Sequence, residues 1–419
     1  MTTEPRFLQI HTLTPYAAAL LNRDDVGMAK RLPFGGSERV RVSSQCLKRH
    51  WRRATDDWSL TSLGGPDALA VRSREIFPRE IAPVLAAEGF DPARIVAVLE
   101  ALKAKVLGES AKAKKDKDDK AEKGDKTEKG AVSPDEAFKS LKTEQVIVLG
   151  QPEIAFITAA ARTLLKDGAA DKDPAKAVEA WLKDKANKAN LEALKRAAGL
   201  DAALFGRMVT SDILARGDAA VHVAHAFTVH RSEAEPDYFT AVDDLVQAAG
   251  ELGSGHINQT ELTSGLFYSY VVVDLPLLVS NLEGCRREDW RKADRTLAGR
   301  VVEHLIHLIA SVSPGAKLGS TAPYAYAELV LVEAGARQPR SLANAFLKPV
   351  ALKRDGDLRA DAIAALGGHL AKFDAMYANG REQRRVAALD GAGTIGADPA
   401  AGLDDLAAWA GALAAGRTP

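Results

Sequence analysis

The sequence lacks the features that identify secreted, membrane-spanning and disulfide-rich proteins. Only two of its 419 residues are cysteines, Cys46 and Cys285. They lie too far apart for a CxxC metal site, and two are too few for a disulfide framework in a chain of this length. No apolar run approaches the roughly 18 residues that a membrane span requires, and the amino terminus lacks the basic-then-apolar order of a signal peptide. We therefore expect a cytoplasmic protein that has reduced thiols and binds no membrane.

A net charge is also absent, because 56 Lys and Arg residues balance 56 Asp and Glu residues. The charges are nevertheless unevenly distributed. Residues 6–53 contain ten basic and three acidic side chains, a net charge of +7, whereas residues 231–251 contain one basic and six acidic side chains, a net charge of −5. Opposed patches of this kind allow a protein to bind a polyanion with one surface and another protein, or its own neighbour, with the other. Two ordinary solvated surfaces are the alternative.

Hydrophobic residues make up 46% of the chain, which excludes a wholly disordered or fibrous protein and allows two or three ordinary domains. Strands are predicted at 7–13, 38–43, 219–230, 262–275 and 325–332. Helices are predicted at 45–54, 290–310, 358–378 and 402–415, with mostly helical stretches at 66–110 and 152–200. This order of elements predicts an α+β fold, in which a sheet with helices on one face is interrupted by insertions.

Residues 111–136 differ from the rest of the chain, because they contain no aromatic and almost no branched apolar side chain. Such a segment cannot bury enough surface to offset the cost of ordering it. We therefore predict a flexible Lys-rich loop inside a helical insertion that spans 60–200.

Cationic residues gather where the second predicted strand leads into a helix. Period-2 alternation places Arg39, Arg41 and Ser43 on one side of that strand, which makes an arginine face available to phosphates. Lys48 and Arg52 follow on the helix, and because they are four residues apart they share one exposed side.

An aromatic pair, Tyr238 and Phe239, lies in the acidic stretch between predicted strands. Cations that follow a backbone, together with a few aromatic stacking platforms, are typical of proteins that hold single-stranded nucleic acid without reading much sequence. The two aromatic residues could equally belong to a core.

Two acidic pairs supply the alternative of an enzyme. Asp24 with Asp25, or Asp243 with Asp244, could hold magnesium for phosphodiester cleavage. Adjacent acids are also common at helix starts and turns, where they cap the backbone or meet a helix dipole. No Ser-His-Asp or Cys-His arrangement follows from spacing, so the residues themselves require neither an enzyme nor a metal or cofactor.

Longer motifs carry a more specific resemblance. Residues 10–52, IHTLTPYAAALLNRDDVGMAKRLPFGGSERVRVSSQCLKRHWR, resemble the amino-terminal signature of the CasC-type backbone subunit of the type I-E CRISPR Cascade complex. Later motifs of that family are resembled, in the same order, by FGRMVTSD at 205–212, DAAVHVAHAFTVH at 218–230, DYFTAVDDL at 237–245, TSGLFYSY at 263–270 and SLANAF at 341–346. The helical stretch 60–200 does not match motif by motif, and its Lys-rich loop looks like an addition.

The resemblance implies an α+β protein shaped like a hand, with a modified RNA-recognition-motif (ferredoxin-like) palm, a helical fingers insertion and a thumb hairpin. The palm would comprise 1–59, 201–229 and 263–419, the last part with the C-terminal helices, while 60–200 with the loop 111–136 would form the fingers and 230–262 the thumb. No RNP-type signature is present, so composition alone does not name this fold.

The resemblance further implies a non-catalytic, crRNA-binding scaffold in antiviral defence. Several copies would polymerise as a helical filament along the spacer of the guide RNA, since a head-to-tail interface that does not close makes a helix. The implied partners are the CRISPR guide RNA, the target DNA strand that pairs with it, further copies of the chain, other Cascade subunits and a separate, recruited helicase-nuclease. No cofactor is implied.

Carried over position by position, the resemblance implies contacts to the RNA backbone from Arg23, Lys30, Ser43, Gln45, Lys48, Arg52 and, in a palm loop, Met208. Phe239 and Thr240 match the thumb tip that wedges into the guide and target. Lys48, Arg52 and Phe239 are also indicated by the residues alone.

Overall fold

The computed structural model describes residues 4–107, 134–185, 187, 199–207, 217–242, 254–377 and 382–418. The chain divides into two compact units. The first comprises Met1–Ser59, Val221–Val279 and Glu288–Pro419, and the second comprises Leu60–Ala220 and Ser280–Arg287. Of the described residues that we expected in the palm, 201–207 and 217–220 group with the helical unit. None of the helices in the described ranges has the length and apolar character of a membrane span.

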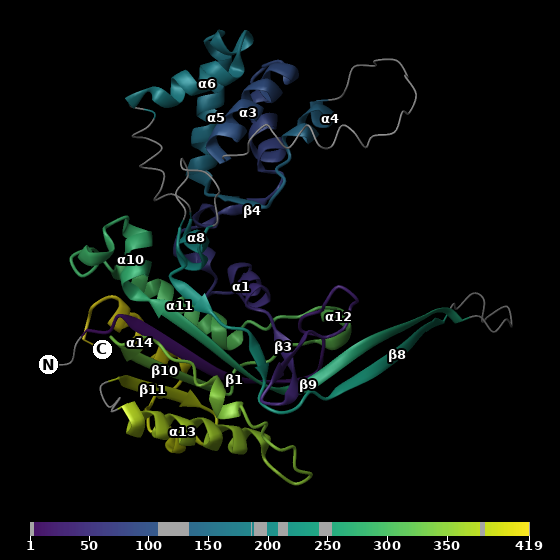
Figure 1. Cartoon of the computed structure of the whole chain (residues 1–419), viewed down its shortest axis with the longest axis vertical. Helices are drawn as coiled ribbons and strands as arrows, with labels where there is room; N and C mark the ends of the chain where they lie inside the picture. Colours follow the sequence, from purple (N-terminus) through teal and green to yellow (C-terminus); the bar gives the residue numbers. More distant parts are fainter. Residues whose placement is uncertain are drawn as a thin grey trace. The chain divides into compact units, whose positions relative to one another are not determined.

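A ten-stranded sheet organises the described part of the first unit (Figure 1). Its strands are β1 (Phe7–Ala19), β2 (Arg31–Phe34), β3 (Ser37–Val42), β6 (Val221–Val223), β7 (Ala226–Thr228), β8 (Ala234–Val242), β9 (Ser254–Asp274), β10 (Leu329–Gly335), β11 (Gln383–Ala388) and β12 (Asp398–Pro399). They follow the order β12-β11-β10-β1-β9-β7-β3-β2, and β6 and β8 also pair with β9. β1 runs antiparallel to both neighbours, so that Leu13 lies opposite Leu329 and Tyr268.

Helices cover both faces of this sheet, so the prediction of helices on one face was wrong. The helices are α1 (Ser44–Arg52), α10 (Leu275–Glu283), α11 (Thr296–Ser311), α12 (Leu318–Thr321), α13 (Leu358–Tyr377) and α14 (Leu403–Ala414). Leu13 and Tyr268 share one buried cluster with Ile363 and Leu366 of α13. Alternate residues of β1 point to the opposite face, where Thr12 lines a small space together with side chains of α1 and α11.

Two hairpins extend from the sheet. Between β2 and β3, Gly35 and Gly36 have φ angles of 60° and 73°, and consecutive left-handed residues of this kind form the tight turn that matches the twist of two antiparallel strands. The second hairpin is much longer, because β8 pairs antiparallel with the first half of β9, with Ala234 opposite Thr263.

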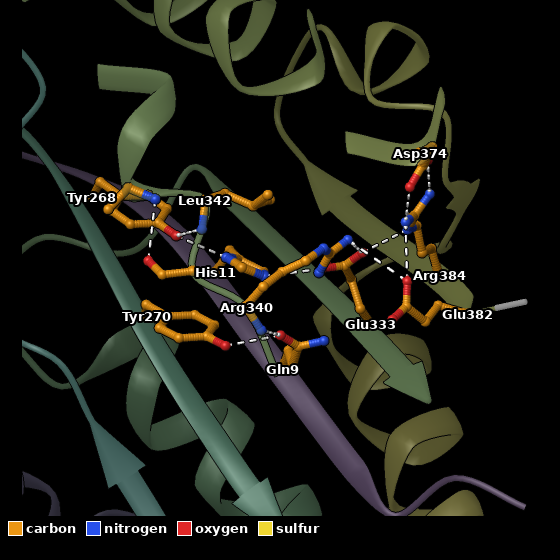
Figure 2. Close-up of polar contacts among 12 residues, drawn as sticks. Gln9, His11, Tyr268, Tyr270, Glu333, Arg340, Leu342, Asp374, Glu382 and Arg384 are labelled. Atoms are coloured by element: carbon orange, nitrogen blue, oxygen red, sulfur yellow. Dashed lines mark hydrogen bonds and ion pairs between the residues drawn. The ribbon is translucent and has the colours of Figure 1, made fainter. Parts of the chain in front are cut away.

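A buried ionic network lies on the α13 face of the sheet (Figure 2). Glu333 of β10 is 0% exposed. It accepts two hydrogen bonds from Arg340, of 2.7 and 2.9 Å, and one of 2.6 Å from Arg384. Arg384 in turn donates to Asp374 of α13. The nearby charges let a carboxylate stay ionised although it is buried.

The same network holds the segment after β10 against the sheet (Figure 2). His11 of β1 is 3.2 Å from Glu333 through Nε2 and 2.9 Å from the Tyr268 hydroxyl through Nδ1. That hydroxyl accepts a hydrogen bond from the Leu342 backbone N–H, and Gln9 Oε1 accepts one from the Tyr270 hydroxyl. Three neighbouring strands thereby position the SLANAF segment.

The second unit has a helical core of its own. Its described elements are β4 (Val71–Ser73), α2 (Ala82–Ala87), α3 (Pro92–Leu107), α4 (Pro134–Phe138), β5 (Ile147–Leu149), α5 (Gln151–Lys166), α6 (Pro174–Lys183) and α8 (Leu200–Phe205). Phe77, Leu99 and Ile157 belong to one buried cluster, and the buried Arg207 and Glu153 form an ion pair of 2.6 Å. Most of the predicted Lys-rich loop lies outside the described residues.

Candidate nucleic-acid interface

Helix α1 presents basic residues because its sequence is amphipathic. Ser43 caps the helix, and its side chain accepts a hydrogen bond of 3.3 Å from the Cys46 backbone N–H. Leu47 and Trp51 are buried on the inner face. The outer residues are Gln45 and Arg49, which are exposed, and Lys48 and Arg52, which are half-buried. Thus Ser43 acts as a helix cap, and the predicted Gln45, Lys48 and Arg52 all lie on one short helix.

The loop before β2 is tied to the start of this helix. Asn22 Oδ1 accepts a hydrogen bond of 2.9 Å from the Ser43 backbone N–H, and the Asn22 carbonyl accepts one from the Lys30 N–H. Arg23 and Ala29 form an isolated β-bridge across the loop. Asp24 Oδ1 accepts hydrogen bonds of 3.1 and 2.8 Å from the N–H groups of residues 26 and 28. The loop thus has a defined conformation that presents Arg23 to solvent.

The loop and the helix together border a polar cavity of about 530 Å³. Its lining residues are Leu21, Asn22, Arg23, Asp24, Asp25, Gly27, Cys46, Arg49, His50, Gly315 and Ala316. Arg23 was predicted, whereas Arg49 and His50 were missed, although Arg49 follows the predicted Lys48 directly. We call this space the Arg23–Arg49 cavity.

A positive field extends from this cavity toward the sheet. Burial lowers the pKa of His225, and the charges of Arg41, Lys30 and Lys48 lower it further. Arg41 Nη1 also donates a hydrogen bond of 3.0 Å to His225 Nδ1, because a guanidinium has no acceptor atom. The charges of the predicted Lys30 and Lys48 therefore both reach His225.

Of the two arginines on the predicted face of β3, Arg41 is half-buried beside His225, whereas Arg39 is not available to phosphates. Arg39 is 0% exposed. Its guanidinium donates hydrogen bonds of 2.9 and 3.2 Å to the carbonyls of Thr228 and His230, and one of 2.9 Å to the carbonyl of Phe346. Alternation places a residue on a face but does not tell whether that face is covered, which is why the prediction for Arg39 was wrong.

A thiol and an imidazole meet in the cavity without forming a nucleophile–base pair. Cys46 Sγ lies 3.7 Å from His50 Nδ1, but that nitrogen is 2.8 Å from the Cys46 carbonyl, to which it donates. Burial raises the pKa of the Cys46 thiol, and the charges of Arg49 and Lys30 offset this only in part. The contact with His50 therefore does not activate the thiol as a nucleophile.

The acidic pair Asp24-Asp25 has a structural explanation in this loop, because Asp24 orders the turn through its carboxylate. Asp243 and Asp244 lie outside the described residues. Among the residues that the structure describes, no cluster of three or more His, Cys, Asp and Glu side chains is arranged to hold a metal ion.

The predicted thumb residues lie on the long hairpin. In β8, Phe239 is opposite Asn258 and Thr240 is opposite Ile257. The backbone of these positions is described, whereas the side chains of Phe239 and Thr240 lie outside the description. Met208 lies wholly outside the described residues. The structure therefore brings together Arg23, Lys30, Ser43, Gln45, Lys48 and Arg52, and leaves the other three predictions open.

The comparisons with known proteins extend over nearly the whole chain. One solved structure, a chain of a "CRISPR RNA-guided surveillance complex, pre-nicking", is 28% identical with a TM-score of 0.72, and the match covers 98% of this chain and 99% of that chain. A chain of a second "CRISPR RNA-guided surveillance complex" is 24% identical with a TM-score of 0.61 over 96% of this chain and 99% of that chain, and it shows similarity of fold. No curated protein matches the sequence.

The family comparison also covers most of the chain. The sequence profile described as "CT1975-like protein" matches residues 8–409, from the start of β1 to the last helix. The match includes both units and all the described residues of the Arg23–Arg49 cavity. The chain therefore belongs to the family of CT1975-like (Cas_CT1975) proteins.

Proposed function

We propose that this chain is a non-catalytic, guide-RNA-binding backbone subunit of a type I-E CRISPR Cascade surveillance complex. Several copies polymerise along the spacer of the guide RNA and present it for pairing with the target DNA strand in antiviral defence in the cytoplasm. Other Cascade subunits complete the complex, and a recruited helicase-nuclease destroys the target. The observation that carries the proposal is the likeness, over 98% of the chain, to a subunit of an RNA-guided surveillance complex.

The division of the chain supports the assignment of its parts. In this proposal the first unit is the palm, the second unit is the fingers, and the β8–β9 hairpin is the thumb. The Arg23–Arg49 cavity, with Lys30, Lys48 and Arg52 nearby, holds the phosphates of the guide, because cations aligned along a backbone give affinity that does not depend on base sequence.

A thiol in the cavity provides a direct test. In a Cys285→Ser background, Cys46 is the remaining cysteine, and its reaction with a maleimide, followed at alkaline pH because burial raises the thiol pKa, reports on occupancy of the cavity. We expect bound single-stranded RNA to slow the reaction, and high salt to restore it because phosphate contacts weaken with salt. A Cys46→Ser variant that retains Cys285 is the matched control. Unchanged labelling of Cys46 on protein that binds RNA in a gel shift would place the RNA elsewhere.

The nuclease alternative is tested at the same loop. Asp24→Asn keeps an oxygen that accepts the backbone hydrogen bonds but removes the charge, so we expect it to retain the loop and to bind RNA at least as tightly. Asp24→Ala loses both hydrogen bonds, at a cost of about 1 kcal/mol each, and should bind RNA less tightly. Divalent-dependent cleavage of RNA or DNA that Asp24→Asn or Asp25→Asn abolishes would contradict the non-catalytic proposal.

A further inference from the structure

Two tyrosines are unusually exposed on the segment that connects α11 to β10. Tyr324 is 73% exposed and Tyr326 is 72% exposed, whereas Ala325 between them is half-buried. The two rings therefore occupy alternate positions of a short stretch whose middle residue faces the protein. Aromatic side chains bury much apolar area when they find a partner, so an exposed pair of this kind needs an explanation.

This segment also forms one wall of the Arg23–Arg49 cavity. Gly315 and Ala316 line the cavity, and the Ala316 N–H donates a hydrogen bond of 2.8 Å to the Leu20 carbonyl. Pro323 packs against Gly315 so closely that a Cβ atom on Gly315 would overlap it. Tyr324 thus follows directly after a residue that contacts the cavity wall.

The backbone that carries the tyrosines is firmly held. The Ser313 hydroxyl accepts a hydrogen bond of 2.9 Å from the Ala325 N–H and donates one of 2.8 Å to the Ala325 carbonyl. Lys317 and Ala322, on either side of α12, have left-handed φ angles of 56° and 37°. Backbone of this kind costs energy in residues other than glycine, and it is concentrated at functional sites. The tyrosines are therefore presented by an ordered wall.

We propose that Tyr324 and Tyr326 form a stacking surface for the bases of the RNA strand whose phosphates lie at the Arg23–Arg49 cavity. The inference rests on the proposed function and adds the contact made to the bases. Residues two apart on an extended backbone are separated by about 7 Å, so the two rings can take neighbouring bases of an extended strand. Every base has a face that stacks on an aromatic ring, so the contact tolerates any guide sequence. Arg23 and Arg49, which line the cavity, favour nucleic acid over a protein partner.

The test separates stacking from phosphate binding. Affinity is measured for a single-stranded RNA and for an RNA of equal length whose internal nucleotides are abasic, so that the phosphates are the same. We expect Tyr324→Ala with Tyr326→Ala to weaken binding of the normal RNA by roughly 5- to 150-fold per base that loses its stack, and to leave binding of the abasic RNA unchanged. Phe at both positions should behave as the parent protein does. Tyr377→Ala, which removes a ring that is 53% exposed on α13, is the control.

Arg23→Ala with Arg49→Ala, in contrast, should weaken binding of both RNAs equally. If this variant loses affinity while the double tyrosine variant does not, the proposed function stands and the stacking surface is overturned. If the tyrosine variant changes only the self-association of the protein in sedimentation, the surface is a contact between copies and the inference is wrong. If the parent protein binds neither RNA, the proposed function itself fails.

Discussion

At the scale of single residues, burial decides what a charge can do. Arg39 and Arg23 both belong to the basic amino-terminal segment, yet Arg39 is fully buried and bonded to three carbonyls, while Arg23 is exposed beside the cavity. Arg31 forms an ion pair with the buried Glu261 of β9. The net charge of the segment therefore overstates the cations that it offers to a polyanion.

The exposed cations give a quantitative prediction. Arg23→Ala with Arg49→Ala removes two phosphate contacts, so the slope of log affinity for single-stranded RNA against log salt should become shallower by about 1.4. Loss of affinity should be similar for all base sequences, because phosphates carry no sequence information. Arg354→Ala with Lys372→Ala, two exposed cations before and on α13, is the matched control. An unchanged slope in the cavity variant would remove these arginines from the interface.

A second prediction at this scale concerns pH. Burial lowers the pKa of His11 below its ordinary value of 6.5, and the charges of Arg340 and Arg384 add to this against the opposing effect of Glu333. The folded protein therefore keeps His11 neutral, where the unfolded chain would take up a proton as the pH falls. Its contribution to stability is fully present above about pH 6.5 and declines below it, by up to about 1.4 kcal/mol per pH unit.

The measurement is the melting temperature between pH 8 and pH 5 for the parent protein and for His11→Gln, which can still donate to Glu333 but does not titrate. The difference between the two proteins should change below about pH 6.5 and stay constant above it. Other histidines with lowered pKa contribute equally to both proteins, namely His225, His230, His307 and His369. A difference that is independent of pH would show that His11 is not the titrating group.

At the scale of elements, the sequence predicts what depends on local pattern. The predicted helices at 358–378 and 402–415 appear as α13 and α14 with nearly the same ends, and α1 lies where its cap and apolar spacing place it. β11 was missed because its sequence, QRRVAA, is polar. Its two arginines become acceptable in a strand only because Glu333, Asp374 and Asp405 pair with them in the folded protein.

The candidate site likewise contains parts that follow from local sequence pattern and parts that depend on contacts between distant segments. Lys48 and Arg52 share a helix face by spacing alone, and Arg23 was carried over from the family resemblance. The wall formed by Gly315 and Ala316 reaches the cavity through a backbone hydrogen bond to Leu20, far away in the sequence. No periodic pattern encodes such a contact, so this part of the cavity and the two exposed tyrosines farther along the same segment could not be predicted.

The β2–β3 turn offers a prediction at this scale. Gly35→Ala and Gly36→Ala each place a side chain on left-handed backbone, which costs about 1–2 kcal/mol. A Cβ atom on Gly35 would in addition overlap the Leu347 carbonyl, whereas one on Gly36 has nothing within 4 Å. We expect Gly35→Ala to lower the free energy of unfolding, measured in urea, by about 1–3 kcal/mol more than Gly36→Ala. Equal losses would mean that the segment after β10 does not hold this hairpin.

At the scale of the whole molecule, the long hairpin is where the proposed assembly places a contact between copies. The first half of β9 pairs with β8 alone in the described part of the chain, whereas its second half, from Thr263, pairs with β1, β6 and β7. A two-stranded ribbon is at best marginally stable in water, and exposed strand edges invite pairing with other chains. In the proposed assembly, the neighbouring copy along the guide RNA supplies the contact that stabilises this hairpin.

Shortening the hairpin tests this role. Pro236 lies opposite Glu261, so residues 237–260 can be replaced by an Asn-Gly turn without a change of register. Glu261 is retained because it accepts a hydrogen bond from the Ala29 N–H and pairs with Arg31. We expect the shortened protein to melt within a few degrees of the parent protein and to bind a short single-stranded RNA with unchanged affinity, because the Arg23–Arg49 cavity remains complete.

The two proteins should differ on long RNA. For the parent protein, the number of bound copies, measured by mass photometry, should rise in proportion to RNA length and cooperatively with protein concentration. For the shortened protein, binding should lose its cooperativity, since each copy is held only by its own phosphates and has no hairpin to place over its neighbour. Cooperative filling by the shortened protein would assign the contact between copies to another surface, and a parent protein that binds as one copy whatever the RNA length would contradict polymerisation itself.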